Sequence, residues 1–173
     1  LGRAAVPLPP FFTGEQCRSA LADAGAVAMI GPAGIMPLDH APAPLPAGTA
    51  KISYTSGSTG RPQGICLSEA QMLATARAVI DRVGPDRAGV HLPLLPLGVL
   101  LENVAGLYAT LIAGGCYHGR PLGKLGMASL FDPAEDLMLD AVAASRATSL
   151  ILVPELLARI VSALRRTGRR LPA

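Results

Sequence analysis

Half of the 173 residues are apolar, only 16% are charged, and the net charge is +3. A chain of this length and composition is expected to form one domain around a hydrophobic core. Charges are scattered and aromatic residues make up 3% of the chain, so the composition excludes a nucleic-acid-binding surface. A membrane span is also excluded, because the most apolar stretch, 92–113, contains two prolines, a glutamate and an asparagine.

The cysteines Cys17, Cys66 and Cys116 are an odd set without Cys-x-x-Cys spacing. This pattern predicts reduced thiols in a cytoplasmic protein rather than a disulfide scaffold. Cys116 and His118 are spaced to face the same side of a strand. Because no second pair of metal ligands accompanies them, they predict a packed strand rather than a zinc site.

The first segment, 1–30, is predicted to fold as strand, helix and strand. A strand at 4–6 is followed by Thr13, a favoured N-cap, and Gln16 completes a capping-box pattern. The helix is expected to stop at Gly25, and the apolar residues that follow predict a short buried strand. This order and spacing predict a parallel crossover unit.

The next segment, 31–49, is rich in Pro, Gly and Ala and predicts a surface connection. Asp39 and His40 lie in it. They are interpreted as residues of a solvated loop rather than as a catalytic pair.

The composition changes at 55–60, where every residue is Ser, Thr or Gly. The residues before it, 51–54, predict a strand that leads into this stretch. Loops of glycine and hydroxyl residues let backbone N–H groups converge on an anion, and Arg61 adds a charge suited to phosphate oxygens. A Walker-type loop is excluded, since Arg61 and Pro62 follow Gly60 where that motif needs Lys and then Ser or Thr. The stretch therefore predicts a phosphate-binding loop of another kind.

Beyond the loop, strands and helices are predicted to alternate. Strands are predicted at 65–67, 89–94 and 149–153, and helices are predicted to begin at Ser68, Asp132 and Pro154. Glu102 lies in an apolar segment and is interpreted as a helix-surface carboxylate, which needs a partner or solvent to stay charged. The alternation predicts an α/β fold with a mostly parallel sheet flanked by helices and the loop at a strand's carboxyl end.

The segment 54–64, which reads Tyr-Thr-Ser-Gly-Ser-Thr-Gly-Arg-Pro-Gln-Gly, resembles the phosphate-loop signature of the AMP-forming adenylating enzymes. That superfamily includes acyl-CoA synthetases and the adenylation domains of peptide synthetases. Weaker resemblance extends over nearly the whole chain. The signature departs at Gln63, where the family usually has Lys, so the charge-assisted contact of that position is lost and Arg61 replaces it in part.

The resemblance implies a ligase in which a carboxylate attacks the α-phosphate of ATP, bound with Mg²⁺, to give an acyl-adenylate and pyrophosphate. A thiol, usually CoA, then takes the acyl group. The implied ATP phosphate-binding residues are Thr55, Ser56, Gly57, Ser58, Thr59, Gly60, Arg61, Gln63 and Gly64. Thr55 is also implied to lie near the magnesium ion. Pro96 stands about where many members have a polar or aromatic pocket residue, which suits a hydrophobic acid.

The chain is expected to be a piece of a longer ligase. It begins with Leu1 rather than Met, and it ends before the family's adenine- and ribose-binding segments and its mobile C-terminal domain. Residues 1–173 are therefore expected to form a partial N-terminal adenylation domain that is inactive alone. Its expected parts are a strand–helix–strand unit (1–30), a Pro/Gly-rich connection (31–49), the phosphate loop with its flanking strands (50–68) and alternating helices and strands (69–173). Its expected partners are ATP, a carboxylic acid, CoA and the remainder of the parent chain.

Two other functions stay open on the sequence. Gln63 in place of Lys favours a degenerate, non-catalytic domain that binds a nucleotide or a partner protein. A Ser-rich loop near a lysine is also similar to amidases with a serine nucleophile, in which Ser53 or Ser58 would attack with Lys51 as the base. The length of the match over 54–64 favours adenylation over the amidase alternative.

Overall fold

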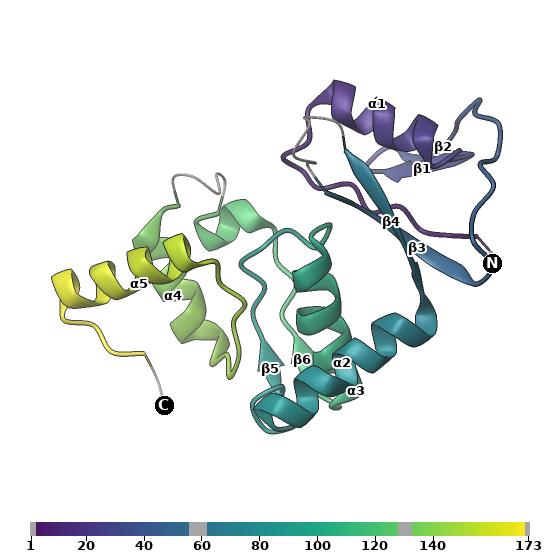
Figure 1. Ribbon diagram of the computed structural model, residues 1–173. Coiled ribbons are helices and arrows are strands. Elements are labelled where there is room, and N and C mark those ends of the chain that lie inside the picture. Colours follow the sequence, from purple (N-terminus) through teal and green to yellow (C-terminus); the bar gives the residue numbers. More distant parts are fainter. Residues whose placement is uncertain (1–2, 56–61, 128–132, 172–173) are drawn as a thin grey trace. The chain divides into compact units, whose positions relative to one another are not determined.

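The computed structural model describes residues 3–55, 62–127 and 133–171 (Figure 1). These residues form two compact units, Leu1–Met72 and Leu73–Ala173, and each unit is described by itself. Helices and small sheets occur in both units, which confirms the predicted α/β class.

A central strand organises the first unit. The unit contains α1 (Gly14–Asp23), β1 (Ala28–Gly31), β2 (Gly34–Pro37), β3 (Thr49–Thr55) and β4 (Gln63–Ser68). β3 pairs antiparallel with β4 and, through Ala5 opposite Lys51, parallel with the N-terminal segment. β3 therefore lies between two extended segments, and its residues 51–54 are all buried, as expected for a strand covered on both faces.

The predicted capping box of α1 is confirmed. Thr13 Oγ1 accepts a hydrogen bond from the Gln16 N–H at 3.2 Å, and Gln16 Oε1 accepts one from the Thr13 N–H at 2.9 Å. The helix buries Ala20 in a cluster with Ile52 and Tyr54 of β3. α1 thus packs on the strand that leads into the predicted phosphate loop.

The prediction of a buried strand at 26–30 within a parallel crossover is wrong. β1 pairs antiparallel with β2 as a hairpin, and Ile30 and Ile35 are 80% and 74% exposed. Pro32 lies in the two-residue turn between the strands, and its fixed φ suits a reversal of the chain. The segment 31–49 consequently contains a strand, although its side chains lie largely at the surface of the unit as predicted.

The second unit places helices around a short parallel sheet. After α2 (Glu69–Val83), which begins in the first unit, it contains β5 (Val90–His91), the π-helix η1 (Glu102–Tyr108), α3 (Ala109–Ile112), β6 (Cys116–Tyr117), the 3-10 helix η2 (Leu122–Leu125), α4 (Glu135–Ser145) and α5 (Pro154–Thr167). β5 pairs in parallel with β6, and His91 pairs in parallel with Ser149. The expected parallel pairing is therefore found in this unit, whereas the two hairpins of the first unit are antiparallel.

Two of the three predicted helix starts in this part of the chain are confirmed. Ser68 Oγ accepts from the Gln71 N–H at 3.2 Å, and Gln71 Oε1 accepts from the Ser68 N–H at 2.9 Å, which caps α2. α5 begins at Pro154 and is followed by Gly168, whose φ of 67° suits a C-terminal cap. The third predicted start, Asp132, lies outside the described residues.

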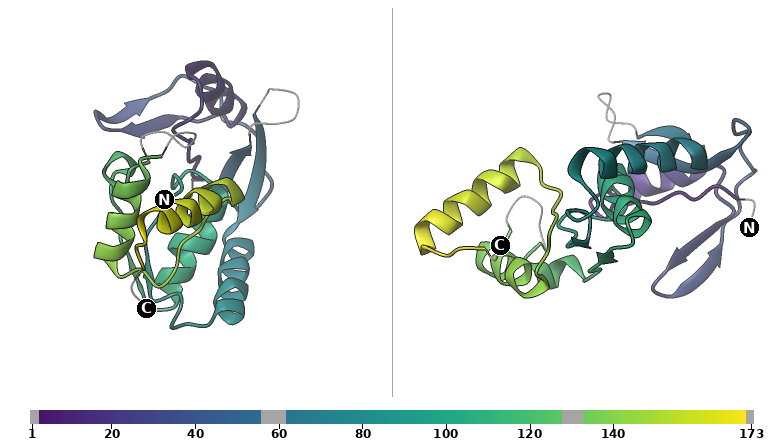
Figure 2. Two further views of the ribbon diagram at one scale, coloured as in Figure 1. Left: turned by 90° about the vertical axis from the view of Figure 1, so that its left-hand side faces the viewer. Right: turned by 90° about the horizontal axis from the view of Figure 1, so that it is seen from below.

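α4 and α5 pack side by side in the second unit (Figures 1 and 2). Their buried residues share one apolar core with the segment after β5, and this core includes Leu92, Leu94, Met138, Leu139, Leu156 and Ile160. Cys17, Cys66 and Cys116 form no disulfide. In the described parts of the chain, every helix is too short or too polar to cross a membrane.

Candidate functional site

Of the predicted phosphate-binding residues, the structure describes Thr55, Gln63 and Gly64. Thr55 ends β3 and Gln63 begins β4, and the two lie opposite each other in the antiparallel register. Both side chains are exposed and so are open to a ligand. The other predicted residues lie outside the described residues: Ser56, Gly57, Ser58, Thr59, Gly60 and Arg61.

The base of this hairpin is held by Tyr54. The buried Tyr54 hydroxyl donates a hydrogen bond to Asp23 Oδ2 at the end of α1, at 2.6 Å. Burial raises the pKa of Tyr54 above its ordinary value, and the hydrogen bond and negative charge of Asp23 raise it further. Gly64 lies opposite Tyr54, and a Cβ at this position would be 2.9 Å from Tyr54 Cζ. Glycine is therefore needed here so that β4 can approach the ring.

The structure disfavours Ser53 as a nucleophile. Ser53 is 3% exposed in the middle of β3, so a substrate does not reach its hydroxyl. Lys51, the base of that alternative, is also buried, and burial lowers the pKa of its ammonium group. Ser58 lies outside the described residues.

A second cluster of polar side chains lies inside the second unit, around His91. His91 Nε2 is 2.8 Å from Glu102 Oε1, and His91 Nδ1 is 2.9 Å from Ser149 Oγ. Tyr117 stacks on the His91 ring with centroids 5.5 Å apart, and its hydroxyl donates to Glu102 Oε1 at 3.3 Å. Burial raises the pKa of Tyr117, and the Glu102 charge adds to this effect.

The interpretation of Glu102 as a surface carboxylate is wrong. Glu102 is 0% exposed, and its Oε2 is buried without a hydrogen-bond partner among the described residues. The carboxylate is tolerated inside because His91 and Tyr117 both reach its other oxygen. The expectation that Glu102 needs a partner is thus confirmed.

Two features of the backbone, a π-helix and a glycine, accommodate the His91–Glu102 contact. Glu102 begins the π-helix η1, a form that is rare and occurs often at functional sites. One turn later, Gly106 faces the pair: a Cβ here would meet Glu102 Oε1 and lie 2.9 Å from His91 Nε2. Glycine thus lets η1 approach the His91–Glu102 contact.

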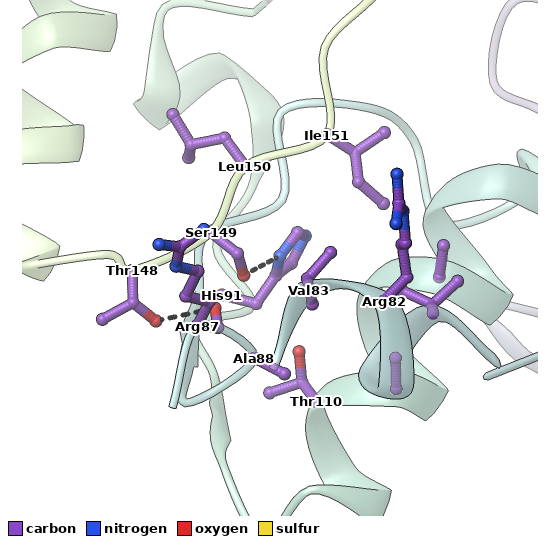
Figure 3. A pocket seen from close by; sticks show the side chains of 13 residues that line it. Arg82, Val83, Arg87, Ala88, His91, Thr110, Thr148, Ser149, Leu150 and Ile151 are labelled. Atoms are coloured by element: carbon purple, nitrogen blue, oxygen red, sulfur yellow. Dashed lines mark hydrogen bonds between the residues drawn. The ribbon is translucent and has the colours of Figure 1, made fainter. Parts of the chain in front are cut away.

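A pocket of about 590 Å³ opens beside His91 (Figure 3). Its walls come from the end of α2, from η1 and α3, and from the segment 148–151. Figure 3 shows the Ser149 hydroxyl and the His91 ring next to each other within it. The apolar lining residues are Val79, Val83, Ala88, Ala105, Ala109, Leu150 and Ile151, and the polar ones are Arg82, Arg87, His91, Thr110, Thr148 and Ser149. A small ligand would meet an apolar wall with a few polar groups, as is usual in binding pockets.

The sequence did not reveal this second cluster. His91 and Ser149 are 58 residues apart, and their contact depends on an isolated parallel bridge between these two residues. The one available signal was Glu102, a carboxylate in an apolar run that had to find a partner.

Comparison with known families agrees with the motif at 54–64. The family model described as AMP-binding enzyme matches residues 37–172. Among curated proteins, the chain is 30% identical to the peroxisomal long chain acyl-CoA synthetase 6 of Arabidopsis thaliana, over 68% of this chain and 15% of that protein. It is 32% identical to the probable non-canonical nonribosomal peptide synthetase CymA of Salinispora arenicola, over 50% of this chain and 1% of that protein. The chain thus spans a small part of each of these relatives.

Solved structures show the same similarity. The amide bond synthetase McbA from Marinactinospora thermotolerans matches 95% of this chain and 38% of its own, with a TM-score of 0.67 and 25% identity. ATP-bound MatB from Rhodopseudomonas palustris matches 65% of this chain and 20% of its own, with a TM-score of 0.51 and 30% identity.

Proposed function

Because this chain belongs to the AMP-binding enzyme family, we propose that it is part of a ligase that activates a carboxylic acid with ATP to an acyl-adenylate. The observation that carries the proposal is the family match over residues 37–172, which includes the signature at 54–64. In this reaction the acid's carboxylate oxygen attacks the α-phosphate and pyrophosphate leaves. Catalysis of such a step depends chiefly on positioning and charge neutralisation.

In this proposal the segment 55–64 holds the ATP phosphates. The β- and γ-phosphates are held by Ser56, Gly57, Ser58, Thr59 and Gly60. Arg61 assists in binding these phosphates, and Gly64 allows the tight turn by which the chain leaves the loop. Support comes from the hairpin base, where the Thr55 and Gln63 side chains are exposed on opposite strands. Both carry groups that hydrogen-bond to phosphate oxygens.

The Thr55 hydroxyl also fits Mg²⁺, which prefers oxygen ligands and is usually shared with substrate phosphates. When bound, the ion supplies positive charge against the phosphates. Thr55 would offer one oxygen from the end of β3, held in place by the pairing of that strand with β4.

A thiol, in particular CoA, is proposed as the acceptor of the acyl group. The 30% identical relative is named a long chain acyl-CoA synthetase, which supports this choice. The cytoplasm is proposed as the location, because the three cysteines form no disulfide.

The test is carboxylate-dependent ATP–pyrophosphate exchange by the complete protein, with acids from acetate to long-chain and aryl acids. Exchange with one class of acid is the expected result, and the chain 1–173 alone is expected to give none. A folded protein that binds ATP but exchanges with no acid would contradict the proposal.

A second candidate is a degenerate domain that binds a nucleotide or partner without catalysis, and Gln63 is the observation that favours it. The test replaces Gln63 with Lys and compares ATP affinity and exchange, with Ala74→Lys on the exposed side of α2 as a control for added charge. Exchange that appears only in Gln63→Lys would support degeneracy. Exchange in the unmodified protein would exclude it.

A further inference from the structure

The pocket beside His91 belongs to the second unit alone. Its described lining residues run from Val79 to Ile151, all within Leu73–Ala173. Their positions are therefore independent of where the first unit lies. None of them belongs to the segment 55–64, which is proposed to hold the ATP phosphates. The volume of about 590 Å³ admits a small molecule, so the pocket is a candidate ligand site in its own right.

Two arginines without partners line this pocket. Arg82 lies in the last turn of α2, Arg87 lies in the turn that follows, and both side chains are exposed. Within the described ranges neither guanidinium group forms an ion pair or a hydrogen bond, whereas Arg166 of α5 pairs with Glu135 at 3.1 Å. None of the thirteen described lining residues is acidic. The pocket thus offers two positive charges with which no described residue pairs.

Helix stability does not explain both arginines. A cation in the last turn of a helix is favoured by the helix dipole, which accounts for Arg82. Arg87 lies four residues beyond Val83, the last residue of α2, so the dipole does not account for it. Figure 3 shows the two arginine side chains on opposite sides of the His91 ring. A ligand between them would have a cation on each side.

The backbone of Arg87 is held in place by Thr148. Thr148 Oγ1 donates to the Arg87 carbonyl at 3.0 Å and accepts from the Val90 N–H at 2.9 Å. The turn is also tight, because a Cβ at Gly89 would lie 2.9 Å from the Asp86 carbonyl oxygen. A site whose backbone is already ordered loses less free energy to ordering when a ligand binds. Arg87 is therefore the better placed of the two arginines to hold an anion.

The lining as a whole indicates the chemistry of the ligand. Apolar side chains, among them Val79, Val83, Leu150 and Ile151, form much of the wall. A guanidinium group matches the two oxygens of a carboxylate. A small organic carboxylate would use both features, whereas an inorganic anion would leave the apolar wall without contacts and a neutral molecule would leave the arginines without a partner.

We propose that this pocket is a binding site for a small organic carboxylate with an apolar body, built from residues other than those proposed to bind ATP. The carboxylate pairs with Arg87, and Arg82 adds a favourable charge from the other side of the pocket. The site does not depend on the proposed adenylation, because its residues belong to the second unit alone.

The test follows hydrogen exchange of the complete protein, without ATP, as benzoate is added. Benzoate should slow exchange in the segments 79–91 and 148–151, because a bound ligand stabilises the walls that contact it. Benzamide has the same shape without the charge, and acetate has the charge without the ring. Each should need at least about tenfold higher concentration for the same effect. The readout is local, so binding of the acid elsewhere in the protein does not affect it.

Three variants separate the roles of the arginines. Arg87→Gln should weaken the benzoate effect about three- to tenfold, since a charged hydrogen bond is lost. Arg82→Gln should weaken it about twofold, because its charge acts across solvent. Arg77→Gln is the matched control: it removes an exposed arginine of the same helix that does not line the pocket, and should change nothing.

Three results would overturn the inference. The first is benzoate that leaves exchange in both segments unchanged or slows it only in other segments. The second is benzamide that acts at the same concentration as benzoate. The third is a loss in Arg77→Gln as large as that in Arg87→Gln. All three arginines are exposed, so their replacement should leave the fold intact.

Discussion

The two units hold a carboxylate next to a tyrosine in different ways. In the first unit Asp23 stays exposed at the end of α1, and the buried Tyr54 hydroxyl reaches out to it. In the second unit Glu102 is itself buried, and His91 and Tyr117 come to it. An exposed carboxylate keeps its hydration when its partner is lost, whereas a buried one depends on its partners. Loss of a partner should therefore be mild in the first unit and severe in the second.

The largest expected effect is that of His91→Ala, which leaves the buried Glu102 carboxyl group without its main partner. We expect a loss of about 3–5 kcal/mol in the free energy of unfolding. Urea unfolding with hydrogen exchange of the second unit measures it. The double variant His91→Leu with Glu102→Leu should recover most of the loss, because it replaces both buried polar side chains with apolar ones. A loss below ~1 kcal/mol in His91→Ala would contradict the contrast between the units.

A glycine lies beside each of the two contacts. Gly106→Ala places a Cβ against Glu102 Oε1 and His91 Nε2, and Gly64→Ala places one against the Tyr54 ring. Overpacking costs about 1–3 kcal/mol, and Gly106→Ala should cost more because its neighbours are held by hydrogen bonds. Thermal unfolding of the Gly106→Ala and Gly64→Ala variants measures the two losses of stability. Gly123→Ala, with open space around the new methyl group, should change little.

Tyr54→Phe tests the exposed contact and should cost about 1 kcal/mol, because Asp23 regains water when the hydroxyl is lost. Asp23→Asn keeps an acceptor and should cost less. Urea unfolding of both variants gives the difference. If Tyr54→Phe lowered the free energy of unfolding as much as His91→Ala, the exposure of Asp23 would not make loss of its partner mild.

A loss of stability that needs no substitution is expected at high pH. Burial raises the pKa of Tyr54 and Tyr117, so the folded protein keeps these protons above pH ~10 while the unfolded chain loses them. The unfolded state then binds fewer protons, and the free energy of unfolding falls as pH rises. Urea unfolding at pH 9 to 11 follows this loss, which should be smaller in Tyr54→Phe. A stability that stays constant over this range would contradict the raised pKa values.

The predictions from sequence were correct where the signal is local. The capping boxes at Thr13 and Ser68 each need two residues three apart, and the start of α5 needs only Pro154. The signature at 54–64 is likewise contiguous, and the family match over this region agrees with it.

The predictions from sequence were wrong or missing where contacts between distant segments determine the structure. The apolar residues 26–30 suggested a buried strand, but the chain reverses at Pro32 and pairs β1 with β2 at the surface. The interpretation of Glu102 as a surface residue failed because its partner His91 lies in a different element, the strand β5, and hydropathy does not encode that contact. The contact between His91 and Ser149 could not be foreseen either, since it arises only when two distant segments pair in parallel.

Adenylation of the acid can be followed with ¹⁸O in its carboxylate, in the acid that supports the fastest exchange. Attack of that carboxylate on the α-phosphate joins one of its oxygens to phosphorus, so the AMP released after acyl transfer should carry one ¹⁸O by mass spectrometry. Release of unlabelled AMP, or of ADP and phosphate, would show that the complete protein does not activate the acid by adenylation.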